Sequence, residues 1–196
     1  MNFAANHHRI QDGDLLAFHG TSCISRLIRW RTSSRVTHVG IAVWVRSRGH
    51  KVLCVLEARE GHGVRLLPAE EVLRRDRQFV WYALWDSVEH ILPDGTKHVT
   101  KIDRAEVVTF ALKQWGKRYA SPWQFVRSFS WVTRRVMDRM GFDLDVDPER
   151  FFCSRLLGES LAAGGYRGSN HLEPEEMSPG DVVELSCYYK EGTVTL

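Results

Sequence analysis

A pair of apolar strands separated by a short turn limits the folds open to this chain more than any other feature of its sequence. Residues 36–45 are rich in Val and Ile and contain Trp44 near their end, and residues 51–58 form a second strand-like run. Residues 46–50, which lie between the two runs, are typical of a turn. The sequence therefore predicts an antiparallel hairpin, and with it an antiparallel sheet.

The remaining segments predict further strands and several helices around this hairpin. Short apolar runs favour strands, whereas apolar residues spaced three and four apart favour helices. We expect strands at residues 15–18, 64–67, 79–85 and 182–185, helices at residues 22–31, 104–115, 121–140 and around Cys153, a helical turn at residues 68–75, and a loop at residues 91–101. The mixture predicts an α+β fold in which an antiparallel, partly closed sheet packs against helices on one side.

The length of the chain and the evenness of its composition favour one domain. Its 196 residues are enough to enclose one substantial hydrophobic core. The chain is 43% hydrophobic and 26% charged, which is ordinary for a globular protein, and no internal repeat marks a second unit. We expect residues 1–11 to form a flexible tail and residues 12–196 to form a single domain.

Charge and cysteine usage argue against several classes of function. The net charge is only +3, and Arg and Lys alternate with Asp and Glu along most of the chain. A nucleic-acid-binding protein usually concentrates its basic residues on one face or tail. The four cysteines, Cys23, Cys54, Cys153 and Cys187, are widely spaced and lack the clustering of a zinc site. We therefore expect no nucleic-acid partner, no metal and no organic cofactor.

The sequence contains no segment typical of export or membrane insertion. Residues 1–11 are polar and lack the apolar stretch of a secretory signal peptide. No run approaches the roughly 20 apolar residues of a membrane span. Together with the separate cysteines, which suit a reducing compartment, these features predict a cytoplasmic location.

Cys153 is the first candidate for chemistry, and it stands in the run FFCSRL at residues 151–156. A buried structural cysteine is the ordinary alternative. At a helix N-terminus, unpaired backbone N–H groups would stabilise a thiolate and would also hold the oxyanion of an acyl intermediate. A helix that begins at Pro148, one turn earlier, would weaken both effects, and the sequence leaves the two boundaries open.

His38 and Glu57 are the next candidates because each places a polar side chain in an apolar strand of the predicted hairpin. Buried imidazole nitrogens and carboxylates need partners. If the strands pair, Glu57 can accept the proton of one imidazole nitrogen and fix the tautomer. His38 can then act as a base toward Cys153. The alternative is that Glu57 lies at a strand end and reaches solvent.

The order of these motifs resembles that of the NlpC-like papain-fold cysteine hydrolases. The segments that carry the resemblance are residues 13–16 (GDLL), 37–41 (THVGI), 56–58 (LEA) and 63–64 (GV). Because the cysteine motif at residues 153–156 follows the histidine, the chain resembles the circularly permuted branch, which includes the YiiX-like and lecithin–retinol acyltransferase-like groups. The resemblance covers residues 12–185, and residues 28–33 also look YiiX-like.

The resemblance implies a circularly permuted papain-like fold with a Cys-His-Glu triad. Cys153 would be the nucleophile, His38 the general base and Glu57 the group that orients the imidazole. Tyr119, which matches a tyrosine that precedes the nucleophile helix in many members, and Ser154 would help to bind the substrate or its oxyanion. For Tyr119, the alternative is a tyrosine of the core or the surface with no role in the site. The long stretch between Tyr119 and Cys153 departs from the family pattern and leaves the shape of the substrate groove open.

The implied activity is hydrolysis or acyl transfer at an amide or ester carbonyl through an acyl-thioester. Peptide, N-acyl and lipid acyl substrates all fit the resemblance, and a phage-derived or effector-like origin would allow action on cell-wall peptides without a signal peptide. One alternative is a binding module on the same fold that has no turnover. Another is an acyl-binding protein on a lipid surface, because residues 121–140 carry aromatic residues and arginines. The commoner interpretation of that pattern is a helix packed on a core.

Overall fold

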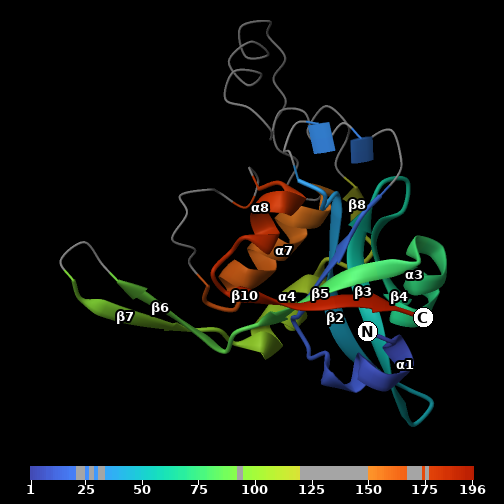
Figure 1. Ribbon diagram of the computed structural model, residues 1–196, viewed down its shortest axis with the longest axis horizontal. Helices are drawn as coiled ribbons and strands as arrows, with labels where there is room; N and C mark the ends of the chain where they lie inside the picture. Colours follow the sequence, from blue (N-terminus) through green and yellow to red (C-terminus); the bar gives the residue numbers. More distant parts are fainter. Residues whose placement is uncertain are drawn as a thin grey trace, which may run out of the picture.

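An antiparallel six-stranded sheet forms the centre of the protein (Figure 1). The computed structural model describes residues 1–20, 25–26, 29–30, 34–91, 95–119, 150–166, 174 and 177–196. The strand order is β10-β5-β1-β2-β3-β4. The strands are β1 (Leu15–Phe18), β2 (His38–Ser47), β3 (His50–Arg59), β4 (Gly63–Pro68), β5 (Gln78–Leu84) and β10 (Tyr188–Thr195). The predicted hairpin is confirmed, because β2 pairs with β3 from Ile41 opposite Leu56 to Ser47 opposite His50.

The two faces of the sheet pack into two separate hydrophobic clusters. The first and third residues of β1 belong to one cluster and the second and fourth to the other, because successive strand residues point to opposite faces. Helices α4 (Arg104–Lys113), α7 (Cys153–Ala163) and α8 (Pro179–Val183) contribute to the first cluster, and α3 (Ala69–Asp76) contributes to the second. The α+β architecture is as predicted, but the expectation of helices on only one side is wrong, because α3 packs on the opposite face.

Two small two-stranded sheets lie outside the main sheet. Strands β6 (Ser87–Ile91) and β7 (Lys97–Lys101) form an antiparallel hairpin that extends away from the main sheet (Figure 1). The prediction of a loop over residues 91–101 is therefore wrong at β7. Strands β8 (Arg118–Tyr119) and β9 (Arg150–Phe151) pair in parallel, which brings the end of β9 and the start of α7 beside Tyr119.

The strand predicted at residues 182–185 is wrong, because α8 occupies this part of the chain. Ser178 precedes the helix, and its hydroxyl accepts a hydrogen bond from the Asp181 backbone N–H at 3.2 Å. The Ser178 backbone N–H in turn donates to the Asp181 carboxylate at 2.7 Å. This capping box, with Pro179 at the start of the helix, favours helix over strand. The last strand of the chain is β10, which the sequence analysis does not predict.

Residues 1–11, for which the sequence predicts a flexible tail, contact the sheet. They form α1 (Phe3–Asn6) and the 3-10 helix η1 (His7–Arg9), and Ile10 is buried in the second cluster. The N-terminal amine of Met1 donates to the Thr193 carbonyl of β10 at 2.6 Å. The helices predicted at residues 22–31 and 121–140 lie largely or wholly outside the described residues.

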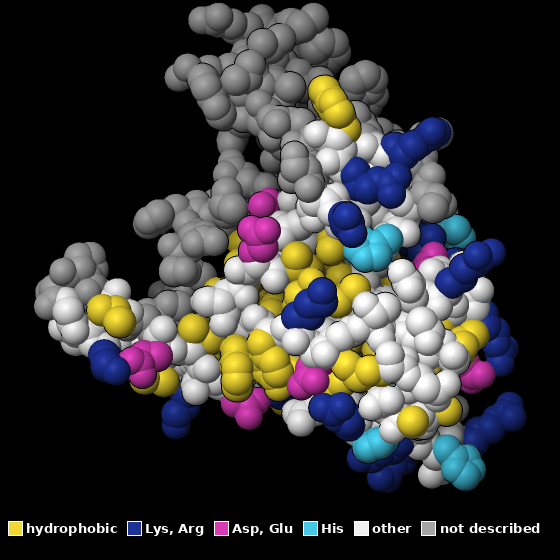
Figure 2. All heavy atoms as spheres, viewed as in Figure 1, with side chains coloured by type: hydrophobic (Ala, Val, Ile, Leu, Met, Phe, Trp, Pro, Cys, Tyr) yellow, Lys and Arg dark blue, Asp and Glu magenta, His cyan; other side chains and the backbone are white. Residues whose placement is uncertain are grey.

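The surface of the described residues carries mixed charge. On the face shown in Figure 2, Lys and Arg side chains are interspersed with Asp and Glu, as the alternation of charges in the sequence indicates. Among the helices that the structure describes, none has the length and hydropathy needed to cross a bilayer.

Candidate active site

His38 and Glu57 form a buried pair on neighbouring strands of the central sheet. His38 begins β2 and Glu57 lies near the end of β3. The distance between His38 Nε2 and Glu57 Oε2 is 2.6 Å, and the Glu57 side chain is fully buried. Gly40 allows this close approach of the strands, because a Cβ there would lie 2.6 Å from Val55 Cγ1 and 3.2 Å from the Leu56 carbonyl oxygen. The expectation that the two strands pair, which would let Glu57 contact the imidazole, is confirmed.

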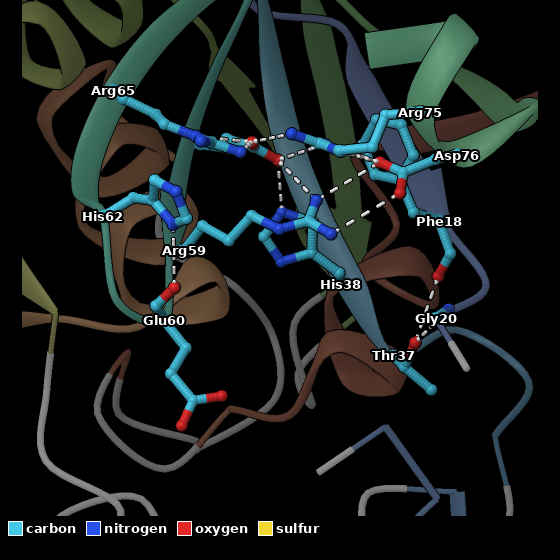
Figure 3. Close-up of polar contacts among 11 residues, drawn as sticks. Phe18, Gly20, Thr37, His38, Arg59, Glu60, His62, Arg65, Arg75 and Asp76 are labelled. Carbon is cyan, nitrogen blue, oxygen red and sulfur yellow. Dashed lines mark hydrogen bonds and ion pairs between the residues drawn. The ribbon is translucent and has the colours of Figure 1, made fainter. Parts of the chain in front are cut away.

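Two arginines, Arg65 and Arg75, also contact the Glu57 carboxylate (Figure 3). Arg65 lies opposite Glu57 on β4 and donates to Glu57 Oε1 from Nε at 2.9 Å and from Nη2 at 2.7 Å. Arg75 of α3 donates to Oε1 at 3.1 Å and to Oε2 at 3.4 Å. The buried carboxylate therefore accepts hydrogen bonds from one imidazole and two guanidinium groups, which satisfies the need of a buried charge for partners.

These contacts shift the pKa values of both members of the pair. Burial alone would raise the pKa of Glu57, but the hydrogen bond and charge of His38, with Arg75 and Arg65, hold that pKa well below its usual range. Burial alone would lower the pKa of His38, but Cys153 and Glu57 together raise it to about 9. At neutral pH this environment favours an imidazolium next to an ionised carboxylate.

Cys153 lies at the first position of helix α7 and is buried. The helix begins at Cys153 with Phe152 as its N-cap, so the alternative start at Pro148 is wrong for α7. Interactions with the Cys153 side chain contribute most to the rise in the pKa of His38. The imidazole Nε2 is engaged by Glu57, so Nδ1 is the nitrogen left to face the thiol.

Tyr119 is brought to the same place by the pairing of β8 with β9, in which it lies opposite Phe151. The segment just before Tyr119 is held against β4, because the Val64 N–H donates a hydrogen bond to the Lys117 carbonyl at 2.8 Å. Gly63 permits this contact, since a Cβ at that position would lie 2.3 Å from the Lys117 carbonyl oxygen. Burial, reinforced by Cys153 and Glu60, raises the pKa of Tyr119 well above its usual value. The phenol is therefore a neutral donor close to the thiol.

Ser154 is also predicted to bind the substrate or its oxyanion, but its side chain makes a hydrogen bond within the protein. The hydroxyl is completely buried and donates to the Met177 carbonyl oxygen at 2.5 Å. This bond ties α7 to the segment that leads into α8. The side chain of Ser154 is therefore occupied by a structural hydrogen bond, whereas its backbone N–H lies in the first turn of α7, where N–H groups have no partner within the helix.

The other described cysteines have environments that suppress their reactivity. Burial raises the pKa of Cys54, and burial raises the pKa of Cys187 to about 12. Neither pKa shift has a histidine among its causes. Cys23 lies outside the described residues. These two buried thiols therefore serve as internal references for the chemistry of Cys153.

The sequence analysis missed the arginines around Glu57, although a signal for one of them is present. A carboxylate inside an apolar strand calls for a cationic partner. The turn after β3 is centred on Gly61, and a hairpin with that centre places Arg65 directly opposite Glu57. Arg75 comes from α3, on an element whose packing the local sequence does not specify.

Comparison with known proteins gives a likeness to a solved structure. No protein-family model matches the chain, and no curated protein matches it. A crystal structure of YiiX from Escherichia coli O157:H7 matches with a TM-score of 0.51 over 95% of this chain and 88% of that chain, at 18% sequence identity. The fold is YiiX-like. At this identity the likeness extends to the fold alone.

The YiiX structure carries the description of a metalloprotein, which applies to that protein. Within the part of this chain that the structure describes, no group of three or more His, Cys, Asp and Glu side chains is arranged to hold a metal ion. His38 and Glu57 are already bonded to each other, and the remaining Glu57 contacts are arginines, which are not metal ligands. The described residues of the site do not fit a metal centre.

Proposed function

We propose that this protein is a cysteine-dependent hydrolase or acyltransferase with a circularly permuted papain-like fold, and that it acts on an amide or ester carbonyl. The observation that carries the proposal is the buried His38–Glu57 pair at 2.6 Å, together with Cys153 at the N-terminus of α7, whose side chain interacts with the imidazole. A structural cysteine has no need of such a partner. The geometry matches the general pattern of a nucleophile, a base and a group that orients the base.

Before the attack, His38 would hold as an imidazolium the proton that the Cys153 thiol has given up. The thiolate attacks the carbonyl carbon and forms a C–S bond, and the negative charge moves to the carbonyl oxygen. The Tyr119 hydroxyl and backbone N–H groups at the start of α7 would donate hydrogen bonds to that oxygen. When the tetrahedral intermediate collapses, the bond to the leaving group breaks and His38 returns the proton to that group. Water or another acceptor then releases the acyl group from sulfur.

The charge around Glu57 suits this sequence of steps. Arg65 and Arg75 keep the carboxylate ionised, and the ionised carboxylate favours the imidazolium that forms when Cys153 loses its proton. The hydrogen bond to Glu57 also fixes which nitrogen of His38 remains for the thiol. Glu57 would therefore orient the base and stabilise its charged form without itself gaining a proton.

Selective alkylation of Cys153 tests the proposal. At pH 6 an ordinary thiol with a pKa of about 8.5 is less than about 1% ionised, whereas a thiolate–imidazolium pair remains reactive. We expect iodoacetamide to label Cys153 at least about tenfold faster than Cys54 and Cys187, and the His38→Ala variant to lose this difference. Peptide mass mapping after timed labelling measures all the rates in one sample.

The matched control is His62→Ala, which removes an exposed histidine that forms a hydrogen bond with the Glu60 carbonyl at 3.0 Å. Labelling of Cys153 should be unchanged in this variant. If Cys153 reacts no faster than Cys187, or if both histidine variants behave alike, the protein is better described as a binding module on the same fold. The lipid-surface alternative depends on residues 121–140, which lie outside the described residues.

A further inference from the structure

Arg59 makes fewer and longer hydrogen bonds to carboxylates than the other two arginines near Glu57. Arg65 makes two short hydrogen bonds to Glu57, and Arg75 makes two to Glu57 and two to Asp76. Arg59 approaches Glu57 Oε2 only to 3.7 Å, and its hydrogen bonds are two longer ones to Asp76 at 3.2 and 3.5 Å. Three of the five N–H donors of its guanidinium therefore have no hydrogen-bond partner among the residues that the structure describes.

The guanidinium of Arg59 lies at the candidate active site. Arg59 is two residues beyond Glu57 on β3, so the two side chains leave the same face of the strand. His38 Nε2 and Arg59 Nη1 both approach the same carboxylate oxygen, Glu57 Oε2, at 2.6 and 3.7 Å. The charge of Arg59 also acts on the Tyr119 phenol, the same phenol on which Cys153 acts. At 32% exposure, the Arg59 side chain is open to a molecule arriving from solvent.

The charges immediately around this guanidinium leave a positive excess. Glu57 and Asp76 are the two carboxylates in contact with Arg59, Arg65 and Arg75. His38 and Cys153 would form a neutral ion pair and do not change this balance. The next acidic residue, Glu60, points its carboxylate away from the guanidinium of Arg59 (Figure 3). The three guanidinium groups therefore outnumber the carboxylates in contact with them by one, and the charge of Glu60 acts at the nearby Tyr119 phenol.

We propose that Arg59 determines specificity at this site, and that the preferred acyl substrates carry an anionic oxygen group, a carboxylate or a phosphate, beside the scissile carbonyl. The inference rests on the proposed function of Cys153 and His38. A guanidinium with free, solvent-facing donors binds such groups through paired N–H···O bonds. The substrate would then displace water from Arg59 and leave the bonds of Arg65 and Arg75 to Glu57 intact.

Two alkylating reagents of nearly the same shape test the proposal without a known substrate. Iodoacetate is an anion and iodoacetamide is neutral, so the ratio of their rates at Cys153 reports the local charge. We expect this ratio to be roughly 3- to 10-fold higher than for N-acetylcysteine amide at low ionic strength. Arg59→Gln should lower the ratio to that of the free thiol, and Arg59→Lys should retain most of it.

Two control variants separate specificity from structure. Asp76→Asn removes the ion pair with Arg59 but keeps the guanidinium, so it should preserve the ratio or raise it, whereas Arg59→Gln lowers it. Arg74→Gln removes a cation from the exposed face of α3, where Arg74 pairs with Glu70, and should have no effect. If Asp76→Asn and Arg59→Gln change the ratio equally, Arg59 only anchors α3 and the proposal is wrong.

Matched esters then test the substrate class itself. We expect Arg59→Gln to raise KM for mono-p-nitrophenyl glutarate several-fold and to leave KM for p-nitrophenyl valerate unchanged. An unchanged preference between the two esters would overturn the role of Arg59 while the reactivity of Cys153 stands. Slow labelling of Cys153 by both reagents, unaffected by His38→Ala, would instead remove the proposed function and this inference with it.

Discussion

The substitution Glu57→Gln probes the part of the site on which the other contacts depend. Glu57 is completely buried, and its two oxygens accept hydrogen bonds from His38, Arg65 and Arg75 at 2.6 to 3.4 Å. Glutamine has nearly the same shape but replaces one acceptor oxygen with an NH2 group. In either orientation of the amide, that NH2 group points at an N–H donor of His38 or of an arginine.

The expected cost follows from the burial of these groups. Removing one partner of a buried ion pair typically costs about 3–5 kcal/mol, because the remaining charge has lost its compensation. We therefore expect Glu57→Gln to lower the free energy of unfolding by about 3–5 kcal/mol. The variant should also lower the pKa of His38 from its value of about 9, since the carboxylate contributes to the rise.

Urea denaturation at neutral pH measures the first effect, and NMR titration of the His38 ring measures the second. Glu70→Gln is the matched control, because Glu70 forms an ion pair of 2.7 Å with Arg74 on the exposed face of α3. An exposed pair of this kind contributes no more than about 0.5 kcal/mol. A loss below about 1 kcal/mol for Glu57→Gln, or an unchanged pKa of His38, would refute the assignment of Glu57 as the charged partner of the imidazole.

Three further predictions concern neighbouring groups. The pKa of His38 lies at about 9, above its ordinary 6.5, so its stabilising contribution is complete below pH 6.5 and is lost as the pH rises through 9; the stability difference between wild type and His38→Gln in urea should shrink over that interval. Tyr119→Phe should lower kcat by about 10-fold or more with little change in melting temperature, since the hydroxyl makes no hydrogen bond to a described residue; an unchanged kcat would contradict an oxyanion role. Ser154→Ala should lower the free energy of unfolding by about 1–3 kcal/mol through loss of its bond to Met177, while labelling of Cys153 in the folded variant stays the same; selective loss of labelling would restore a direct role for the hydroxyl.

The sequence by itself determines the central hairpin and the two polar side chains within it. Strand periodicity and a short turn depend on neighbouring residues, so residues 36–45 and 51–58 specify β2 and β3 without help from the rest of the chain. Within that hairpin, a histidine and a glutamate in apolar surroundings predict mutual contact, because neither can be buried alone. The Arg65 partner follows from the same local rule applied to the next turn.

The tertiary structure decides what converges on that hairpin. The start of α7 at Cys153 depends on the β8–β9 pairing that delivers the chain to it, and the competing start at Pro148 is locally as plausible. The sequence does not specify the hydrogen-bond partner of the Ser154 hydroxyl. That partner is the Met177 carbonyl only because of how the chain packs.

Arg75 of α3 and Arg59 of β3 also show which contacts the local sequence predicts and which depend on tertiary packing. Arg75 reaches Glu57 because α3 packs on the second face of the sheet, whereas Arg59 leaves the same strand face as Glu57 and approaches its carboxylate only to 3.7 Å. Local periodicity fixes the face from which a side chain leaves its element. Which partner it finds depends on segments distant in the chain, whose contacts are set by the burial of apolar surface over the whole domain.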